Sequence, residues 1–232
     1  MSPIRVLAVD DSALMRNMLS AVVNQQPDME MAGTAPDAFI ARELIKQLNP
    51  DVLTLDIDMP RMDGLEFLSR LMRLRPMPVI MISSLTTRGS KATLSALEHG
   101  AADFLPKPEH RAAENIESWG QQVVEKIRIA ARAKLNLRSQ RTRPILAGIP
   151  VRQQSIIAIG SSTGGTEALR QVLMPLPVST PGIVIAQHMP SGFTHSFAQR
   201  LDSLCQIAVR EAQDGEPVLP GTALIAPGDR HM

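Results

Sequence analysis

Five polar residues in the first 110 positions are of the types that phosphoryl chemistry requires: Asp10, Asp11, Asp56, Ser83 and Lys107. Each lies at or just beyond the end of a short apolar run, so a parallel sheet would bring all five to one edge. Three carboxylates there would repel one another, and Mg²⁺, which prefers oxygen ligands, relieves that repulsion. Asp56 is then placed to attack a phosphoryl donor, with Lys107 and the Ser83 hydroxyl against the phosphoryl oxygens.

The elements that must position these residues follow from an alternation of apolar runs and helical patterns. We predict strands at residues 5–9, 30–33, 52–55, 79–82 and 103–105. Helical patterns lie between them, for example over 13–24 and 64–74. Five strands that alternate with helices indicate a parallel, doubly wound α/β sheet. A single aspartate at a strand end is usually a helix cap or a turn residue, but the whole set is far more specific.

Residues 4–108 resemble the receiver domain of two-component response regulators. The segments that carry the resemblance are VDDS, LDIDMPRMDG, ISS and GAADFLPKP. The resemblance implies a flavodoxin-like fold, in which a five-stranded parallel sheet has the strand order 2-1-3-4-5. It also implies that a histidine kinase supplies the phosphoryl group.

The same resemblance implies roles for individual residues of this first site. The Mg²⁺-binding set would be Asp10, Asp11, Asp56 and the backbone carbonyl of Asp58, with Asp10 lying nearby rather than ligating directly. Asp56 would be the phosphorylated residue. Ser83 would then engage the phosphoryl group, and Phe104 would change its rotamer in response. Many receivers have threonine at the position of Ser83, and serine keeps the hydroxyl.

A second segment that could do chemistry is GSSTGG, residues 160–165, which follows an apolar run and precedes a helical pattern. Such a turn can cradle a phosphate, present a serine as a nucleophile, or serve only as a tight turn. The segment lacks both the G-x-G-x-x-G spacing and the lysine of a P-loop, which disfavours nucleotide binding. A nucleophile needs a base, and His188 follows a strand that we expect beside the serine's strand.

The second half of the chain resembles the effector domain of the chemotaxis protein-glutamate methylesterases. The segments that carry this resemblance are AIGSSTGGTEALR, AQHMPSGFTHSFAQRL, EAQDGEPVLPG and IAPGDRHM. It implies hydrolysis of glutamate methyl esters on chemoreceptors and deamidation of certain glutamines, with the receiver gating its own esterase. It maps the nucleophile to Ser162 and the general base to His188. We infer that Thr163, Gly164 and the following amides begin a helix that helps to stabilise an oxyanion.

A serine hydrolase of this type also uses an aspartate that orients the histidine. In the family that aspartate lies in a glycine-rich motif that this sequence does not contain, and the resemblance gives the role to neither Asp214 nor Asp229. We therefore expect an N-terminal portion of a methylesterase, with a competent receiver and a weak or inactive esterase. The alternative is a non-catalytic phospho-receiver protein whose second unit only binds a partner.

The expected organisation has three parts. We predict a receiver domain at 1–110, a helix and flexible linker at 111–152, and a partial doubly wound α/β esterase domain at 153–232. The tail of the helical stretch is a basic run, RIAARAKLNLRSQRTR, which we interpret as part of a solvated linker that ends near Arg152. In the last part we predict strands at 155–160, 182–187, 206–209 and 222–227, and helices at 166–173 and 193–204.

Composition narrows the class of protein further. A net charge of +1 and an aromatic content of 3% disfavour nucleic-acid binding. No apolar run approaches the roughly 18 residues that a membrane span needs, and the N-terminus has no targeting pattern. The single cysteine, Cys205, favours a reducing compartment. We expect a monomeric cytoplasmic protein whose partners are a chemotaxis histidine kinase and methylated chemoreceptors.

Overall fold

A computed structural model describes residues 2–83, 87–108, 113–132 and 155–232 of the chain. The chain divides into two compact units, Met1–Asn136 and Leu137–Met232. Most of the predicted linker, including the larger part of the basic run, lies outside the described residues. Within the described ranges, every helix is too short or too polar to cross a lipid bilayer.

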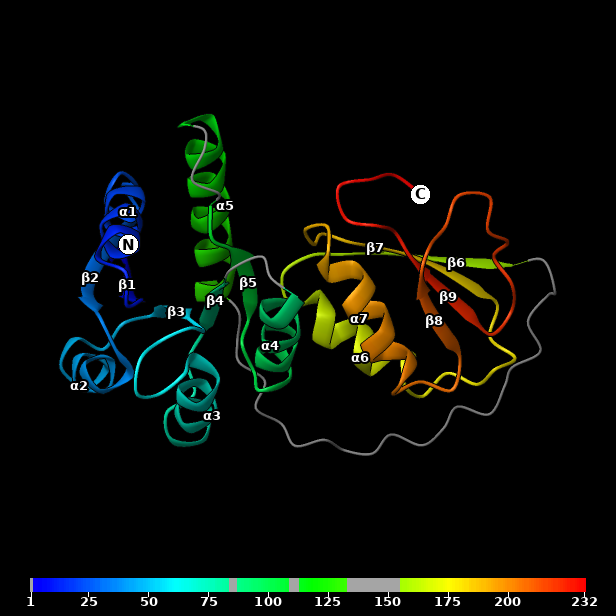
Figure 1. Ribbon diagram of the computed structural model, residues 1–232, viewed down its shortest axis with the longest axis horizontal. Coiled ribbons are helices and arrows are strands. Elements are labelled where there is room, and N and C mark those ends of the chain that lie inside the picture. The colour runs from blue at the N-terminus through cyan, green and yellow to red at the C-terminus, as the bar shows by residue number, and fades with distance from the viewer. Residues whose placement is uncertain (1, 84–86, 109–112, 133–154) are drawn as a thin grey trace. The chain divides into compact units, whose positions relative to one another are not determined.

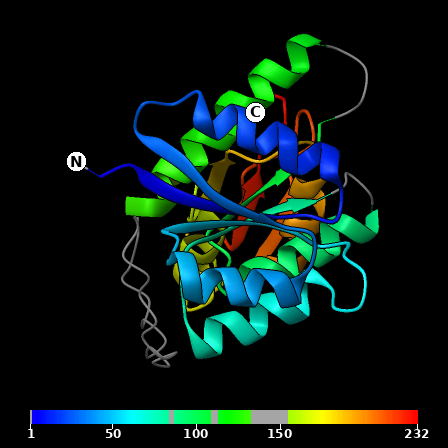
Figure 2. The same cartoon turned by 90° about the vertical axis from the view of Figure 1, so that its left-hand side faces the viewer.

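The first unit is a five-stranded parallel sheet covered by helices on both faces (Figures 1 and 2). Its elements in chain order are β1 (Ile4–Val9), α1 (Ala13–Asn24), β2 (Met29–Ala35), α2 (Ala38–Leu48), β3 (Val52–Asp56), α3 (Gly64–Leu74), β4 (Val79–Ser83), α4 (Thr87–Glu98), β5 (Asp103–Pro106) and α5 (Ala113–Arg132). The strand order is β2-β1-β3-β4-β5, which confirms the predicted order. Each predicted strand overlaps an observed one.

The sequence explains why this sheet forms. Strands β3 and β4 are buried along their whole length, as apolar strands with helices on both faces must be. Three of the helices begin at side chains that cap their first turns: Ser12 at α1, Asp37 at α2 and Asp63 at α3. These caps place the turns that follow β1, β2 and β3, so the carboxyl edge of the sheet is built from short, defined connections.

Helix α5 corrects one predicted boundary. We assigned residues 111–152 to a connecting helix and linker, but α5 belongs to the first unit. Its residues Trp119, Val123 and Ile127 are buried in the same hydrophobic cluster as residues of β1 and β4. The Trp119 indole N–H also donates to the carbonyl of Pro106 at the end of β5, at 2.7 Å. The receiver core therefore needs this helix.

The second unit contains a four-stranded parallel sheet (Figure 1). Its elements are β6 (Ile156–Ser161), α6 (Gly165–Leu173), β7 (Gly182–Gln187), α7 (Phe193–Asp202), β8 (Ala208–Glu211) and β9 (Thr222–Ile225), in the order β6-β7-β9-β8. All four predicted strands are present. Because both helical crossovers run in the same direction along the sheet, right-handed connections place α6 and α7 on the same face. Strand β6 is at an edge and largely exposed, with Ile156 at 61% exposure.

Candidate functional site

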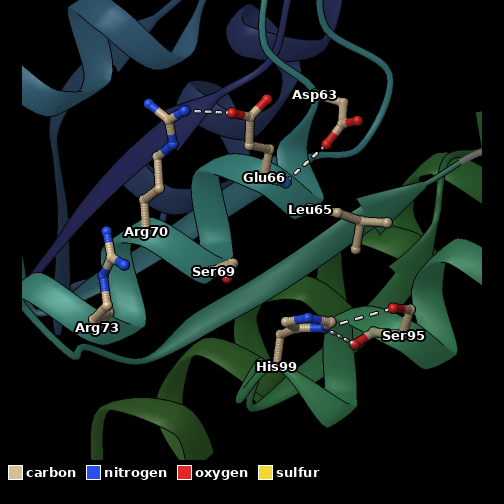
Figure 3. Close-up of a pocket in the computed structure, with 8 residues that line it drawn as sticks. All are labelled: Asp63, Leu65, Glu66, Ser69, Arg70, Arg73, Ser95 and His99. Atoms are coloured by element: carbon tan, nitrogen blue, oxygen red, sulfur yellow. Dashed lines mark hydrogen bonds and ion pairs between the residues drawn. The ribbon is translucent and has the colours of Figure 1, made fainter.

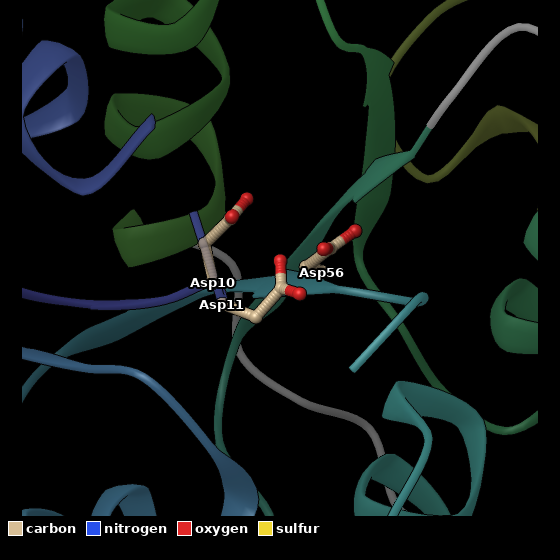
Figure 4. Close-up of side chains that lie close together, drawn as sticks. All are labelled: Asp10, Asp11 and Asp56. Atoms are coloured by element: carbon tan, nitrogen blue, oxygen red, sulfur yellow. The ribbon is translucent and has the colours of Figure 1, made fainter. Parts of the chain in front are cut away.

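The three aspartates of the first site meet at the carboxyl edge of the first sheet (Figure 4). Asp10 and Asp11 follow β1, and Asp56 ends the neighbouring strand β3. One carboxylate oxygen from each lies within 4.8 Å of the others. Asp10 and Asp56 are buried and Asp11 is exposed, so the cluster is open on the Asp11 side.

Lys107 joins this cluster from β5, two strands away from β3. Its Nζ lies 2.7 Å from Asp56 Oδ2 and 3.0 Å from Asp10 Oδ2. The Lys107 backbone N–H donates to the carbonyl of Ser83 at 2.8 Å, which fixes the start of the loop after β5. Although burial lowers the pKa of Lys107, its hydrogen bond and attraction to Asp56 and Asp10 hold that pKa above its ordinary value. The amine is therefore a cation aimed at the phosphoacceptor.

Asp56 is an unusual carboxyl group. Burial and, to a smaller extent, the negative charge of Asp10 outweigh the opposing effect of Lys107 and raise the pKa of Asp56 from 3.8 to about 6. Asp56 Oδ1 is buried and, among the described residues, has no hydrogen-bond partner. A buried, unpartnered carboxylate oxygen beside two other carboxylates fits a hard cation such as Mg²⁺. The donor set of Asp10, Asp11 and Asp56 thus suits the predicted metal.

The remaining predicted residues of this site lie around Asp56. The backbone of Asp58 donates a hydrogen bond that lowers the pKa of the Asp56 carboxyl, and the Asp58 side chain is exposed. Ser83 is buried at the end of β4, next to β3. Phe104 is buried in β5 with 4% exposure. Asp58 and Ser83 therefore lie at the carboxyl edge of the sheet, whereas Phe104 lies within β5 opposite Met81, and its rotamer change stays a prediction.

Gly64 is a part of this site that the sequence analysis quoted within LDIDMPRMDG without giving it a role. A Cβ at this position would overlap the carbonyl oxygen of Asp56 and lie 2.9 Å from Ile57 Cα. The Gly64 N–H donates to the Ile57 carbonyl at 2.9 Å. Glycine is needed because helix α3 starts directly against the backbone of the phosphoacceptor.

A surface pocket of about 520 Å³ lies between α3 and α4 in the first unit (Figure 3). It is separate from the acidic cluster, since its walls contain none of the predicted site residues. Its charges are partly paired, because Arg70 binds Glu66 at 2.5 Å. The His99 ring contacts the carbonyl of Ser95, at 2.7 Å from Nδ1. We assign no ligand to this pocket.

The second site lies where β6 and β7 end side by side. Ser162 follows β6 and His188 follows β7, and the two strands are neighbours as predicted. Ser162 Oγ lies 3.4 Å from His188 Nδ1, and both side chains are exposed. Helix α6 begins after Gly164, whose φ of 75° is readily adopted only by glycine, and no side chain caps this helix. Thr163 lies between the serine and this helix start.

The serine–histidine contact is at the long end of hydrogen bonding, which is common where no substrate is bound. Within the described ranges, no carboxylate hydrogen-bonds to His188. Asp229 Oδ2 instead accepts from the backbone N–H of Ser191, at 3.2 Å, and Asp214 is exposed. The described part of the second site is thus a pair rather than a triad.

The sequence analysis did not single out Gln187, which precedes His188. Its side chain is buried between the two loops that carry the serine and the histidine. Nothing in the sequence distinguishes a buried glutamine at the end of a strand from an exposed one, because both follow the same apolar run.

Comparison with known proteins agrees with this two-part architecture. The family model described as "Response regulator receiver domain" matches residues 6–116, and the one described as "CheB methylesterase" matches residues 157–232. The crystal structure of the response regulator domain of Thermotoga maritima CheB is 43% identical, with a TM-score of 0.52. It covers 57% of this chain and 98% of that chain.

Two relatives that match over the whole chain carry the same name. The protein-glutamate methylesterase/protein-glutamine glutaminase of Salmonella typhimurium is 58% identical over 234 residues, covering 100% of this chain and 67% of that relative. The protein of the same name from Escherichia coli is 59% identical, with the same coverage.

An acidic phosphoacceptor site joined to a parallel α/β unit with a serine–histidine pair defines a response regulator with a hydrolase effector. The chain spans about two thirds of the length of these relatives and matches them throughout. It belongs to the protein-glutamate methylesterase/protein-glutamine glutaminase family.

Proposed function

We propose that this chain carries the phosphorylation-regulated hydrolysis of glutamate methyl esters on chemoreceptors, together with deamidation of particular glutamines. The observation that carries the proposal is the approach of Ser162 Oγ to His188 Nδ1, at 3.4 Å, at the ends of two adjacent strands. The names of the whole-chain relatives supply the substrate class.

In the receiver, the Asp56 carboxylate attacks the phosphorus of a phosphohistidine on a chemotaxis histidine kinase, and the histidine leaves. Lys107, at 2.7 Å from Asp56, compensates the negative charge that the phosphoryl group brings. Mg²⁺ held by Asp11, Asp56 and the Asp58 carbonyl, with Asp10 nearby, would neutralise the phosphoryl oxygens when bound. The Ser83 hydroxyl then hydrogen-bonds the phosphoryl group, and Phe104 changes its rotamer in response.

In the effector unit, Ser162 Oγ attacks the carbonyl carbon of the glutamyl ester while His188 takes the hydroxyl proton. His188 gives that proton to the leaving methanol, and an acyl-enzyme ester forms on Ser162. Water, deprotonated by His188, then hydrolyses this ester and frees the glutamate. With a glutamine substrate, ammonia leaves in place of methanol. Backbone amides from Thr163 and Gly164 onward stabilise the oxyanion.

The proposed regulation is what the family resemblance implies. In this proposal the unphosphorylated receiver restricts access to Ser162, and phosphorylation of Asp56 relieves the restriction. We place the reaction in the cytoplasm, in a monomer, where the kinase and the methylated receptor segments are accessible. The weak or inactive esterase expected from the sequence also stays a prediction.

The test is methanol release from methylated chemoreceptor membranes, with Mg²⁺ and a small phosphodonor present. We compare the unchanged chain with Ser162→Ala, and with Ser203→Ala as a matched control, because Ser203 is an exposed serine whose hydroxyl bonds only the Arg200 carbonyl. Release that is lost only in Ser162→Ala supports the esterase. Detectable release that is equal in all three proteins contradicts it and favours the non-catalytic alternative, whereas no release beside normal phosphorylation of Asp56 matches the inactive esterase expected from the sequence.

A further inference from the structure

Gln187 is the last residue of β7, and its side chain lies between the loops that carry Ser162 and His188. It is 8% exposed. Its Oε1 accepts a hydrogen bond from the Ser161 hydroxyl, at 2.6 Å. Its Nε2 donates to the backbone carbonyls of Ser162, at 3.1 Å, and of His188, at 3.2 Å. One buried amide therefore contacts the backbone of both residues of the proposed catalytic pair.

The orientation of this amide is determined by its partners. Backbone carbonyl oxygens only accept hydrogen bonds, so the amide nitrogen must face Ser162 and His188. The oxygen is then left to accept from Ser161. Glutamate of the same shape loses the two donors, and methionine loses every polar contact. Only glutamine supplies two donors and one acceptor at this length.

The first turn of α6 approaches the Gln187 side chain closely. A Cβ on Gly165 would overlap Gln187 Oε1 and lie 2.8 Å from Ser161 Cβ, so the first turn of α6 packs directly on the amide. The two loops also join through the backbone, since the His188 N–H donates to the Ser161 carbonyl at 2.9 Å. The amide thus lies between the loops after β6 and β7 and the first turn of α6.

We propose that Gln187 is a positioning residue, which holds Ser162 and His188 at the distance that proton transfer requires. The inference rests on the proposed esterase function. Ser162 and His188 are both exposed, so packing of their own side chains contributes little to their placement. Their positions depend on their backbones, and Gln187 is the side chain that bonds both.

The experiment measures how fast a fluorophosphonate probe labels Ser162 in the whole chain. In this reaction Ser162 Oγ bonds to phosphorus, fluoride leaves, and His188 takes the hydroxyl proton. We compare Gln187→Met with Gln199→Met, a control at an exposed glutamine whose side chain hydrogen-bonds His195. Because misplacement by about 1 Å costs about 100-fold in rate, we expect labelling to slow by about 10- to 100-fold in Gln187→Met. The control should keep the original rate.

A second variant, Gln187→Glu, separates positioning from a general effect on folding. A protonated glutamic acid regains one donor, while a carboxylate has none and faces two carbonyl oxygens. The ratio of the Glu rate to the Met rate should therefore rise as the pH is lowered. Thermal unfolding of each variant shows that the protein is folded at the assay temperature.

Two results overturn the inference in different ways. Labelling of Gln187→Met at the original rate, or a Glu-to-Met ratio that does not change with pH, overturns the positioning role and leaves the esterase proposal intact. Failure of the unchanged chain to be labelled at Ser162, together with no Ser162-dependent methanol release, overturns both. Slow labelling of Gln187→Met with the expected pH-dependent ratio supports the inference.

Discussion

Replacement of Lys107 by methionine tests the electrostatics of the phosphoacceptor site. The lysine Nζ lies 2.7 Å from Asp56 Oδ2 and 3.0 Å from Asp10 Oδ2, and both carboxyl groups are 1% exposed. Methionine preserves much of the side-chain volume and removes the positive charge. Two buried carboxylates then share one edge of the sheet without a compensating cation, so we expect the folded state to lose stability wherever they are ionised.

The magnitude follows from the pKa of Asp56. Burial raises this pKa from 3.8 to about 6 even with Lys107 present. A shift of roughly 2 units at about 1.4 kcal/mol per unit means that the ionised group already destabilises the fold by about 3 kcal/mol. Because the folded pKa is the higher one, stability from this group is greatest below 3.8 and is lost as the pH rises through about 6. Without Lys107 the pKa rises further and the loss extends to higher pH.

We therefore expect Lys107→Met to be less stable than the unchanged chain by about 3–5 kcal/mol at pH 8, the usual cost of removing one partner of a buried ion pair. At pH 5, where Asp56 in the variant is protonated, the difference should shrink to about 1 kcal/mol. Added Mg²⁺ should reduce the deficit at pH 8, because the cation replaces part of the lost charge.

Urea unfolding followed by Trp119 fluorescence measures this difference. Trp119 is the only tryptophan and is 5% exposed in α5, so its signal reports the first unit. Lys46→Met is the matched control, because Lys46 is an exposed lysine paired with Glu43. A deficit of equal size at pH 5 and pH 8, unaffected by Mg²⁺, would show that lost packing rather than charge causes the effect, and would refute this reasoning.

Two further substitutions test the local geometry of the first unit. Gly64→Ala should destabilise it by about 1–3 kcal/mol and weaken Mg²⁺ binding, because the new Cβ meets the Asp56 backbone; unchanged urea unfolding and unchanged Mg²⁺ titration would contradict this. Ile127→Ala, at a fully buried position of α5, should cost about 2–5 kcal/mol in Trp119-detected unfolding. A loss below about 1 kcal/mol there would mean that α5 is not part of the receiver core.

Much of the first unit was predictable because its signals are local. Apolar runs that alternate with helical patterns located every strand of the first sheet, and both example helices, α1 and α3, have the predicted bounds. Asp56 and Lys107 were identified because each comes directly after a strand, and strands of a parallel sheet share one carboxyl edge. The distance of 2.7 Å between these two side chains is a consequence of that arrangement.

Helix α5 shows that local sequence signals predict a helix but not where it packs. Its pattern predicts a helix, but a helix has the same pattern whether its apolar face packs on its own sheet or elsewhere. Burial of Trp119, Val123 and Ile127 against β1 and β4 decides the matter, and it involves residues about 40 to 120 positions apart in the chain. The position of this helix is therefore a property of the packed core.

The same distinction between local sequence signals and tertiary packing applies to the two sites. Sequence alone determined which groups are available: the acidic set around Asp56, the serine in GSSTGG and a histidine after the neighbouring strand. Residue types and the ends of strands can both be recognised from the sequence. Only the tertiary structure decided how these groups act on one another. Burial raises the pKa of Asp56 to about 6, and Gln187 contacts the backbones of both Ser162 and His188. Desolvation and long-range hydrogen bonds depend on what surrounds a residue in space, and no local pattern encodes those surroundings.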